Sequence, residues 1–233
     1  MRPLATSSQK LHRRGESRPA SRRTVLKGLI APLLIPSVAA AAAEDTIMLP
    51  APRKEGGLSF MEAVSLRQST RAYAARGFDH QVLSDLLWAA FGINRPESKG
   101  RTAPSWRGSA ETDIYVAVSD GVWLYRAEEH ALRRILTDDI RAEIGEQPYV
   151  KTAPVILIYA ADKSRMYEAP DEQHVRFAYV DSAYVSQNVY LFAAAFGLKT
   201  VVIGSIKAEA VAKRLGLRPE QLITLGQPIG YPV

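Results

Sequence analysis

The sequence predicts one α+β domain, in which layers of helix and strand enclose a core. Apolar segments of helical period and short β-branched segments are interspersed, without a regular strand–helix–strand alternation and without an internal repeat. No G-x-G-x-x-G or Walker sequence occurs, which disfavours a Rossmann or P-loop nucleotide site. About 190 residues follow the N-terminal leader, which is enough for one domain with a substantial core.

The helices are predicted from capping residues and apolar spacing. Ser59 and Glu62 form a capping box, so we expect a helix over about 60–67. Asp79 is a second candidate N-cap, because apolar residues at helical spacing follow it as far as Gly92. Further helices are expected at 138–144, at 177–196 before Gly197, and at 209–215 before Gly216.

The strands are predicted from short β-branched or apolar segments between turn residues. The run 155–160 is continuously apolar, which is typical of a buried central strand. The other expected strands are 114–118 and 122–126, joined as a hairpin by Ser119-Asp120-Gly121, then 200–203 and 222–225. Residues 44–57 read as an extended linker or arm, and the polar stretch 93–110 as a long loop.

Residues 1–43 read as an export signal. The sequence S-R-R-T-V-L-K precedes an apolar run that Pro32 and Pro36 interrupt and that ends in small residues. It resembles the twin-arginine signal, with Val25 in place of the usual aromatic residue and matches at Ser21, Arg22, Arg23, Leu26 and Lys27. An ordinary Sec signal and an uncleaved membrane anchor are the alternatives.

Composition excludes several classes of chemistry. The chain has no cysteine, so it has no disulfide, thiol redox centre or thiolate metal site. Its four histidines lack metal-ligand spacing, so we predict no metal site. The leader holds eight basic residues and one acidic residue, and the remainder has 22 basic and 23 acidic residues. The high pI therefore belongs to the leader, and we infer no nucleic-acid binding.

A first candidate site is the stretch R-Q-S-T-R, residues 67–71, which follows the first predicted helix. Two arginines and two hydroxyl groups in so short a stretch are suited to a phosphate monoester. Arg67 and Arg71 share a face if the helix continues, and converge in a turn if the helix ends. The alternative is a solvated basic helix end that complements the helix dipole.

Two further stretches are candidates. The first, 101–109 (R-T-A-P-S-W-R-G-S), lies in the long loop, where flat backbone can rest against a planar ring. The alternative is a mobile surface loop, although Trp106 is expected to pack on something. The second, 181–205, carries Gln187 and Asn188 in a helix and Gly204 at a strand end, where a ligand can approach closely. Its alternative is a core helix whose amides satisfy nearby backbone.

Taken in order, these three stretches resemble the nitroreductase family of flavin-dependent oxidoreductases. The motifs are R-x-S-x-R, then A-P-S before a strand, then D-S-x-x-x-x-Q-N-x-x-L-x-A-x-x-x-G-L before a strand ending in glycine, and finally P-I-G-Y-P. The resemblance covers residues 58–233, which we take as the domain. The T-A-P-S and Q-N-V-Y-L features look closest to a branch near the dehydrogenases that oxidise azoline rings in modified peptides.

The resemblance implies an intertwined α+β homodimer with a mostly antiparallel sheet and two FMN molecules at the subunit interface. Residues that would hold the FMN phosphate and ribityl chain are Arg67, Gln68, Ser69 and Arg71. Residues that would cover the isoalloxazine from the other subunit are Pro104, Ser105 and Trp106. The backbone of Gly204 and Ser205 would lie near flavin N5 and O4. The family often needs no catalytic acid or base, and we name no catalytic residue.

The implied function is an exported oxidoreductase that uses FMN for ping-pong hydride or electron transfer with a small organic substrate. Because FMN is loaded in the cytoplasm, a route that exports folded proteins to the periplasm suits such a protein. The electron donor stays open between NAD(P)H, a quinone and a partner protein. No membrane attachment is expected once the leader is cleaved.

Two departures from the family pattern lie near the expected site. Many relatives carry an Asn shortly after the P-S pair, where this chain has R-G-S at 107–109. Many relatives also end with a basic segment that clamps the phosphate, a role left here to Arg67 and Arg71, with Lys207 as a further candidate. The alternative is therefore a non-catalytic protein on this fold that has lost FMN and binds a small molecule or a partner.

Overall fold

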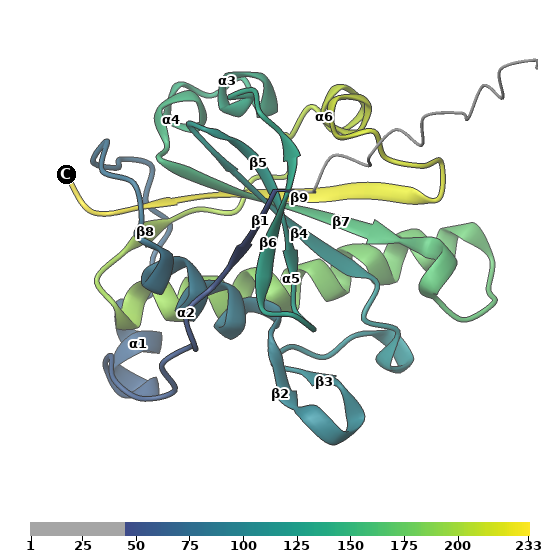
Figure 1. Cartoon of the computed structure of the whole chain (residues 1–233), viewed down its shortest axis with the longest axis horizontal. Coiled ribbons are helices and arrows are strands. Elements are labelled where there is room, and N and C mark those ends of the chain that lie inside the picture. Colours follow the sequence, from purple (N-terminus) through teal and green to yellow (C-terminus); the bar gives the residue numbers. More distant parts are fainter. Residues whose placement is uncertain (1–44) are drawn as a thin grey trace, which may run out of the picture. The chain divides into compact units, whose positions relative to one another are not determined.

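A central antiparallel sheet organises the domain. The computed structural model describes residues 45–233, and the strand order across the sheet is β1-β6-β5-β4-β7-β9-β8 (Figure 1). The strands are Thr46–Met48 (β1), Thr112–Val118 (β4), Gly121–Arg126 (β5), Ala131–Leu136 (β6), Val155–Asp162 (β7), Lys199–Thr200 (β8) and Gln221–Gly230 (β9). Neighbouring strands pair antiparallel throughout. The predicted α+β class with a mostly antiparallel sheet is confirmed.

Helices cover both faces of the sheet (Figure 1). Helices α2 and α5 pack on one face with α1 against α5, and α3, α4 and α6 lie on the other face. Their bounds are Phe60–Leu66 (α1), His80–Phe91 (α2), Arg141–Ile144 (α3), Pro148–Thr152 (α4), Asp171–Ala195 (α5) and Ala208–Leu215 (α6). Three short 3-10 turns occur at Pro96–Ser98, Trp106–Gly108 and Lys163–Arg165.

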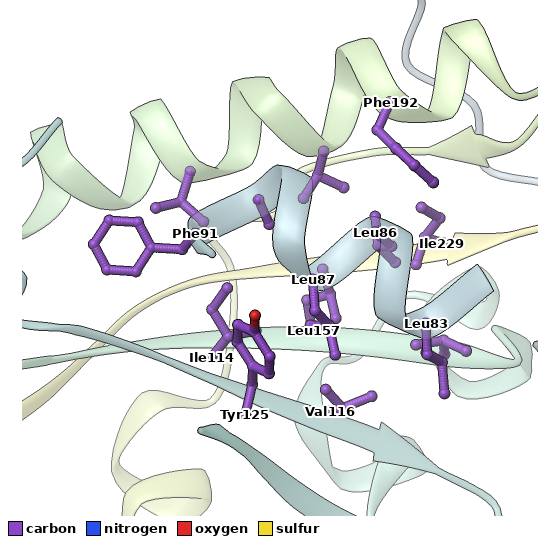
Figure 2. Close-up of a cluster of buried hydrophobic side chains, with 14 of the residues drawn as sticks. Leu83, Leu86, Leu87, Phe91, Ile114, Val116, Tyr125, Leu157, Phe192 and Ile229 are labelled. Atoms are coloured by element: carbon purple, nitrogen blue, oxygen red, sulfur yellow. The ribbon is translucent and has the colours of Figure 1, made fainter. Parts of the chain in front are cut away.

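The central strand β7 joins two apolar cores, one on each face of the sheet. All eight of its residues are buried, as the continuous apolar run predicts. Val155, Leu157 and Tyr159 belong to the core under α2 and α5, whereas Ile156 and Ile158 belong to the core under α3, α4 and α6. Figure 2 shows the first core, where leucines of α2 point toward side chains of the sheet. Both faces of the sheet are therefore closed to water here.

The capping predictions are confirmed. The backbone N–H of Glu62 donates to the Ser59 hydroxyl, and the Glu62 carboxylate accepts from the Ser59 backbone N–H at 3.0 Å. The Asp79 carboxylate accepts from a backbone N–H of the first turn of α2 at 2.8 Å. Gly216 closes α6 in the left-handed conformation, with φ of 65°. These caps fix where α1, α2 and α6 begin or end.

The segment 45–57, predicted as a linker or arm, packs against the sheet and α2, and its Leu49 is buried in the core. Its strand β1 pairs with β6 at the sheet edge. Farther along, the Arg53 guanidinium lies 2.6 Å from the carboxylate of Asp85, and Ser84 donates to the backbone carbonyl of Pro50 at 2.6 Å. The export signal predicted at 1–43 lies outside the described residues. Among the described residues, the helices are all too short or too polar to cross a membrane.

The strand predicted at 200–203 is wrong beyond its first residue. The ladder between β8 and β9 ends at Thr200. The Val201 N–H still donates to the Pro228 carbonyl at 3.3 Å, but a proline has no N–H to donate back. Pairing resumes only as a single bridge between Ile203 and Gly226. Residues 201–205 therefore run as irregular backbone beside the sheet.

Other predictions differ in extent. The helix expected from 138 begins only at Arg141; its N-cap is Ile140, and the Asp139 carboxylate before it accepts from the Arg141 N–H at 3.1 Å, a local bond that competes with helix. The loop 93–110 contains a short ribbon, Ile93–Arg95 (β2) with Gly100–Arg101 (β3). Strand β6 was not predicted, because charged residues interrupt its apolar pattern. One of them, Arg134, lies 4.0 Å from the centre of the Trp123 ring.

Candidate functional site

The stretch R-Q-S-T-R lies beside strand β8. Helix α1 ends at Leu66, because Arg67 adopts φ −56° and ψ 118°, which is not helical. The chain then runs extended: Ser69 forms a parallel bridge with Thr200, and the Thr70 N–H donates to the Thr200 carbonyl at 2.9 Å. The continuing helix is therefore wrong, and residues 67–71 run extended and do not form the turn in which the two arginines were expected to converge.

The hydroxyl of Tyr190, on α5, connects this stretch to the irregular backbone after β8. It lies 2.9 Å from the Ser69 hydroxyl and accepts the Val202 backbone N–H at 2.9 Å. The Arg67 guanidinium lies 5.2 Å from the centre of the Tyr190 ring. One tyrosine thus holds together two of the three predicted stretches, and sequence reasoning did not identify it.

The guanidinium groups of both arginines in this stretch are available to bind an anion. Neither Arg67 nor Arg71 forms a salt bridge within residues 45–233. Arg71 lies 5.9 Å from the ring centre of Tyr149. By contrast, Lys207 is paired with Glu146 at 3.1 Å, so it is already engaged. The two arginines are therefore the better anion-binding groups.

A hollow of about 350 Å³ lies between α1 and the C-terminal end of α5. Gln68, Tyr190 and Thr200 contribute to its wall, together with Leu58, Leu66, Ala193, Ala194, Ala195, Gly197, Leu198 and Lys199. Small-molecule sites typically measure about 300–1,000 Å³. The hollow is thus large enough for part of a small ligand.

The backbone at Gly204 and Ser205 is exposed and has free space beside it. A Cβ placed at Gly204 would meet no atom within 4 Å. The Gln147 side-chain amide donates to the Ser205 hydroxyl, while the buried Gln147 carbonyl oxygen has no hydrogen-bond partner among the described residues. An antiparallel bridge between Gly145 and Ile206 holds this segment. Sequence reasoning missed Gln147, because it lies 58 residues from its partner.

The stretch 101–109 packs against another part of α5. The Trp106 N–H donates to the Asp181 carboxylate at 2.6 Å, and the Trp106 ring stacks on Phe177 at 4.9 Å. Pro104 is exposed, and Ser105 is partly buried. Asp181 precedes Tyr190 by nine residues on α5, or about 13 Å along the helix axis. One chain therefore does not bring Pro104, Ser105 and Trp106 to the arginines.

The two amides of α5 have different surroundings. Asn188 donates to the backbone carbonyls of Ala89 and Ala90 at 3.1 and 3.3 Å, so the structural alternative holds for it. Gln187 is exposed. Within 45–233, no three or more His, Cys, Asp or Glu side chains form a group suited to a metal ion. The site is therefore built from arginines, hydroxyls and backbone.

Comparison with known families shows which family the chain belongs to. The model described as the Nitroreductase family matches residues 64–231. The chain belongs to the nitroreductase family. Members of this family are typically flavin-dependent oxidoreductases. The family prediction is thereby confirmed.

Individual relatives support the nitroreductase assignment over most of the chain. The nitroreductase-family protein MJ1384 of Methanocaldococcus jannaschii is 30% identical over 177 residues, which cover 72% of this chain and 88% of that protein. A nitroreductase-family crystal structure from Ralstonia eutropha JMP134 is 34% identical, covers 84% of this chain and 93% of its own, and gives a TM-score of 0.78. The NADPH:FMN oxidoreductase of Vibrio harveyi shares the fold, with 21% identity, 74% and 68% coverage and a TM-score of 0.57.

The contribution of the Tyr190 hydroxyl to the stability of this nitroreductase-family chain can be tested by removing it. Tyr190→Phe is expected to lower the free energy of unfolding by about 1–2 kcal/mol, because the Val202 N–H loses its partner. Urea denaturation measures this change. Tyr167→Phe removes the hydroxyl of a tyrosine that is 53% exposed; it is the control and should change stability by less than about 0.5 kcal/mol. Equal effects of the two substitutions would contradict the role given to Tyr190.

Proposed function

We propose that the chain is an exported FMN-dependent oxidoreductase. One observation carries the proposal. The Tyr190 hydroxyl bonds both to Ser69 in the arginine stretch and to the Val202 N–H, which precedes the open backbone at Gly204. The residues present fit FMN in two respects. Two guanidinium groups without salt bridges in 45–233 suit a phosphate, and an unpartnered buried carbonyl at Gln147 lies next to Ser205, where a hydrogen-bond donor is wanted.

In this proposal each stretch has one task. Arg67 and Arg71 bind the phosphate, while Gln68 and Ser69 bind the ribityl chain. The backbone of Gly204 and Ser205 lies along the edge of the ring system. When bound, the flavin supplies hydride and electron transfer, and the protein supplies position and electrostatics. A donor and a small organic acceptor that use the same site in turn give ping-pong kinetics.

The proposed assembly is a homodimer. Large apolar side chains of α1, α5 and their flanks are exposed: Leu58, Phe60, Met61, Val64, Leu66, Tyr179, Val180, Tyr184 and Phe196. A monomer seldom leaves so many neighbouring apolar residues in water. Because one chain keeps Trp106 away from Arg67, a site that uses both needs a second copy, whose Pro104, Ser105 and Trp106 would cover the ring. This geometry supports the dimer that the resemblance implies.

Export through the twin-arginine route to the periplasm remains part of the proposal, on the strength of the S-R-R-T-V-L-K sequence. A route for folded proteins suits a chain that must receive its cofactor in the cytoplasm. The branch that oxidises azoline rings is the relationship we favour, from the T-A-P-S and Q-N-V-Y-L features. The electron donor is proposed to be NAD(P)H, a quinone or a partner protein.

The second candidate is a non-catalytic protein that has lost FMN and binds a small molecule or a partner. One observation favours it: the Trp106 ring is stacked on Phe177 of its own chain, so it is already engaged. The departure from the family pattern at 107–109 lies in the same loop. The retained R-Q-S-T-R favours the enzyme.

The deciding experiment is the absorption spectrum of the purified protein, with and without added FMN. We expect flavin bands and about one FMN per subunit, which is the stoichiometry of two shared sites in a homodimer. Light scattering on the same sample gives the oligomeric state. A colourless protein that also fails to take up added FMN would overturn the enzyme proposal in favour of the second candidate.

A further inference from the structure

Two buried carboxyl groups meet beneath the loop that carries Trp106. Asp181 of α5 is 2% exposed, and Glu111, just before β4, is 0% exposed. A side-chain hydrogen bond to Glu111 is among the causes that raise the pKa of Asp181, which places the two carboxyl groups side by side. Neither forms a salt bridge within residues 45–233. Because two carboxylate anions have no proton to donate, this contact requires one proton shared by the pair.

The same two carboxyl groups hold both ends of the loop. Asp181 accepts the Trp106 N–H at 2.6 Å, and Glu111 accepts the Ser109 hydroxyl at 2.7 Å. Just outside these two points, the Ala110 N–H donates to the Ser105 hydroxyl at 2.9 Å and closes the loop. The turn that includes the predicted flavin-covering residues therefore depends on the pair for its position.

The loop has an unfavourable backbone and needs such support. Arg107 and Ala110 have φ values of 52° and 47°, in the left-handed region that residues other than glycine rarely adopt, and Gly108 between them has φ of 75°. Residues in this region persist only where their surroundings determine the conformation. Loss of the contacts to the pair would release that constraint.

We propose that Asp181 and Glu111 are positioning residues, whose shared proton holds the 104–110 loop in the conformation that presents Ser105 and Trp106 to a partner subunit. When the proton is lost, the two carboxylates repel each other and the loop is released. The role of this loop in covering a ligand of the partner subunit rests on the proposed function. The positioning itself requires no cofactor and is testable without one.

The direction of the pH dependence follows from burial. Burial raises the pKa of Asp181 to about 7; the Trp106 N–H opposes this rise, and the neighbouring Glu111 adds to it. An aspartate in an unfolded chain has a pKa of about 3.9. Between those pH values the folded protein binds more protons than the unfolded chain, so the pair's contribution to stability falls as pH rises. The loop is held below neutral pH and released above it.

Other charged groups face this region and must be separated from the pair. The Arg165 guanidinium donates to the Glu111 backbone carbonyl and pairs with Asp113, and it also lies near Asp162. Arg107 and His174 contact the Trp106 ring. Of these, His174 is the only group that ordinarily titrates near neutral pH, so it needs its own control.

The test is a pH titration of tryptophan fluorescence on the protein without added flavin, from pH 5 to pH 9. The Trp106→Phe variant identifies the share of the signal that comes from Trp106, one of three tryptophans. In the wild type we expect a transition near neutral pH. Asp181→Asn keeps an acceptor for the Trp106 N–H and gives Glu111 a permanent donor, so it should abolish the transition and keep the low-pH signal throughout. Glu111→Gln should do the same.

Two controls make the result decisive. Asp85→Asn removes an aspartate that is equally buried but paired with Arg53, and it should leave the transition in place. His174→Gln should also leave it in place. Absence of the transition in the wild type, its persistence in both Asp181→Asn and Glu111→Gln, or its loss in His174→Gln would each overturn the inference.

The outcome is separable from that of the proposed function. If the transition behaves as expected but the protein binds no FMN, the positioning role stands and the flavin proposal fails. If FMN binds but the transition is absent, the flavin proposal stands and the positioning role fails.

Discussion

Replacing Arg67 and Arg71 together by alanine is expected to weaken FMN binding on the order of 100-fold or more. Each guanidinium would donate charge-assisted hydrogen bonds to the phosphate, and such bonds contribute about 1.5–3 kcal/mol each. Neither arginine has a salt bridge within 45–233 to lose, so the fold should be little affected. Quenching of FMN fluorescence on titration with the protein measures the affinity.

Two controls show whether the phosphate is the group recognised. Riboflavin lacks the phosphate, so its affinity should change little in the double variant. Arg76→Ala removes a nearby arginine that lies over the ring of Tyr231, and it should leave FMN affinity unchanged. A parallel loss of FMN and riboflavin affinity would argue that the arginines support the fold of the pocket and do not hold the phosphate.

The second large effect is expected from Gly204→Val, which should abolish retention of FMN while leaving the melting temperature of the flavin-free protein unchanged. The fold tolerates a side chain here, because a Cβ would meet no atom within 4 Å and the backbone is not in the left-handed region. The ligand would not tolerate it, because the new methyl groups would occupy the space beside the exposed backbone. Absorbance after gel filtration and a thermal melt give the two quantities.

Gly77→Val is the matched control. Gly77 is also exposed, a Cβ placed there would meet no atom within 4 Å, and its backbone is not in the left-handed region. The substitution should leave both the melting temperature and FMN retention as they are in the wild type. Full retention of FMN by Gly204→Val would mean that the flavin ring does not lie against this backbone.

Local sequence signals predicted the elements that depend on neighbouring residues. The capping box at Ser59, the N-cap at Asp79 and the apolar run of β7 each act over a few residues, and the structure confirms them. The position of the arginine stretch depends instead on one dihedral pair at Arg67, which ends α1. The sequence left both arrangements open because neither helix nor turn is excluded by R-Q-S-T-R.

The contacts that assemble the site join residues far apart in the chain, and the sequence holds no signal for them. Tyr190 is 121 residues from Ser69, and Gln147 is 58 residues from Ser205. Tyr190 looks like an ordinary helix residue, and Gln147 like an ordinary polar residue before a proline, until their partners are placed. The hydrogen bond from Trp106 to Asp181 spans 75 residues and is equally hidden. Prediction of the packing of Trp106 was possible only in general terms, from its size.

The overlong strand prediction has a single physical cause, which is Pro228. The β-branched run after Thr200 suits a strand, but the proline of β9 faces it without an N–H. The Val202 N–H then turns to the Tyr190 hydroxyl. A strand prediction made from the β-propensity of one segment takes no account of a backbone N–H that is missing from the neighbouring strand.

That missing donor also bears on which positions can vary. With any other residue at 228, an added N–H would face the Val201 carbonyl and complete a pair that now has one hydrogen bond, from the Val201 N–H to the carbonyl of residue 228. Position 228 therefore affects the backbone that leads to Gly204, although its side chain offers no group to a ligand.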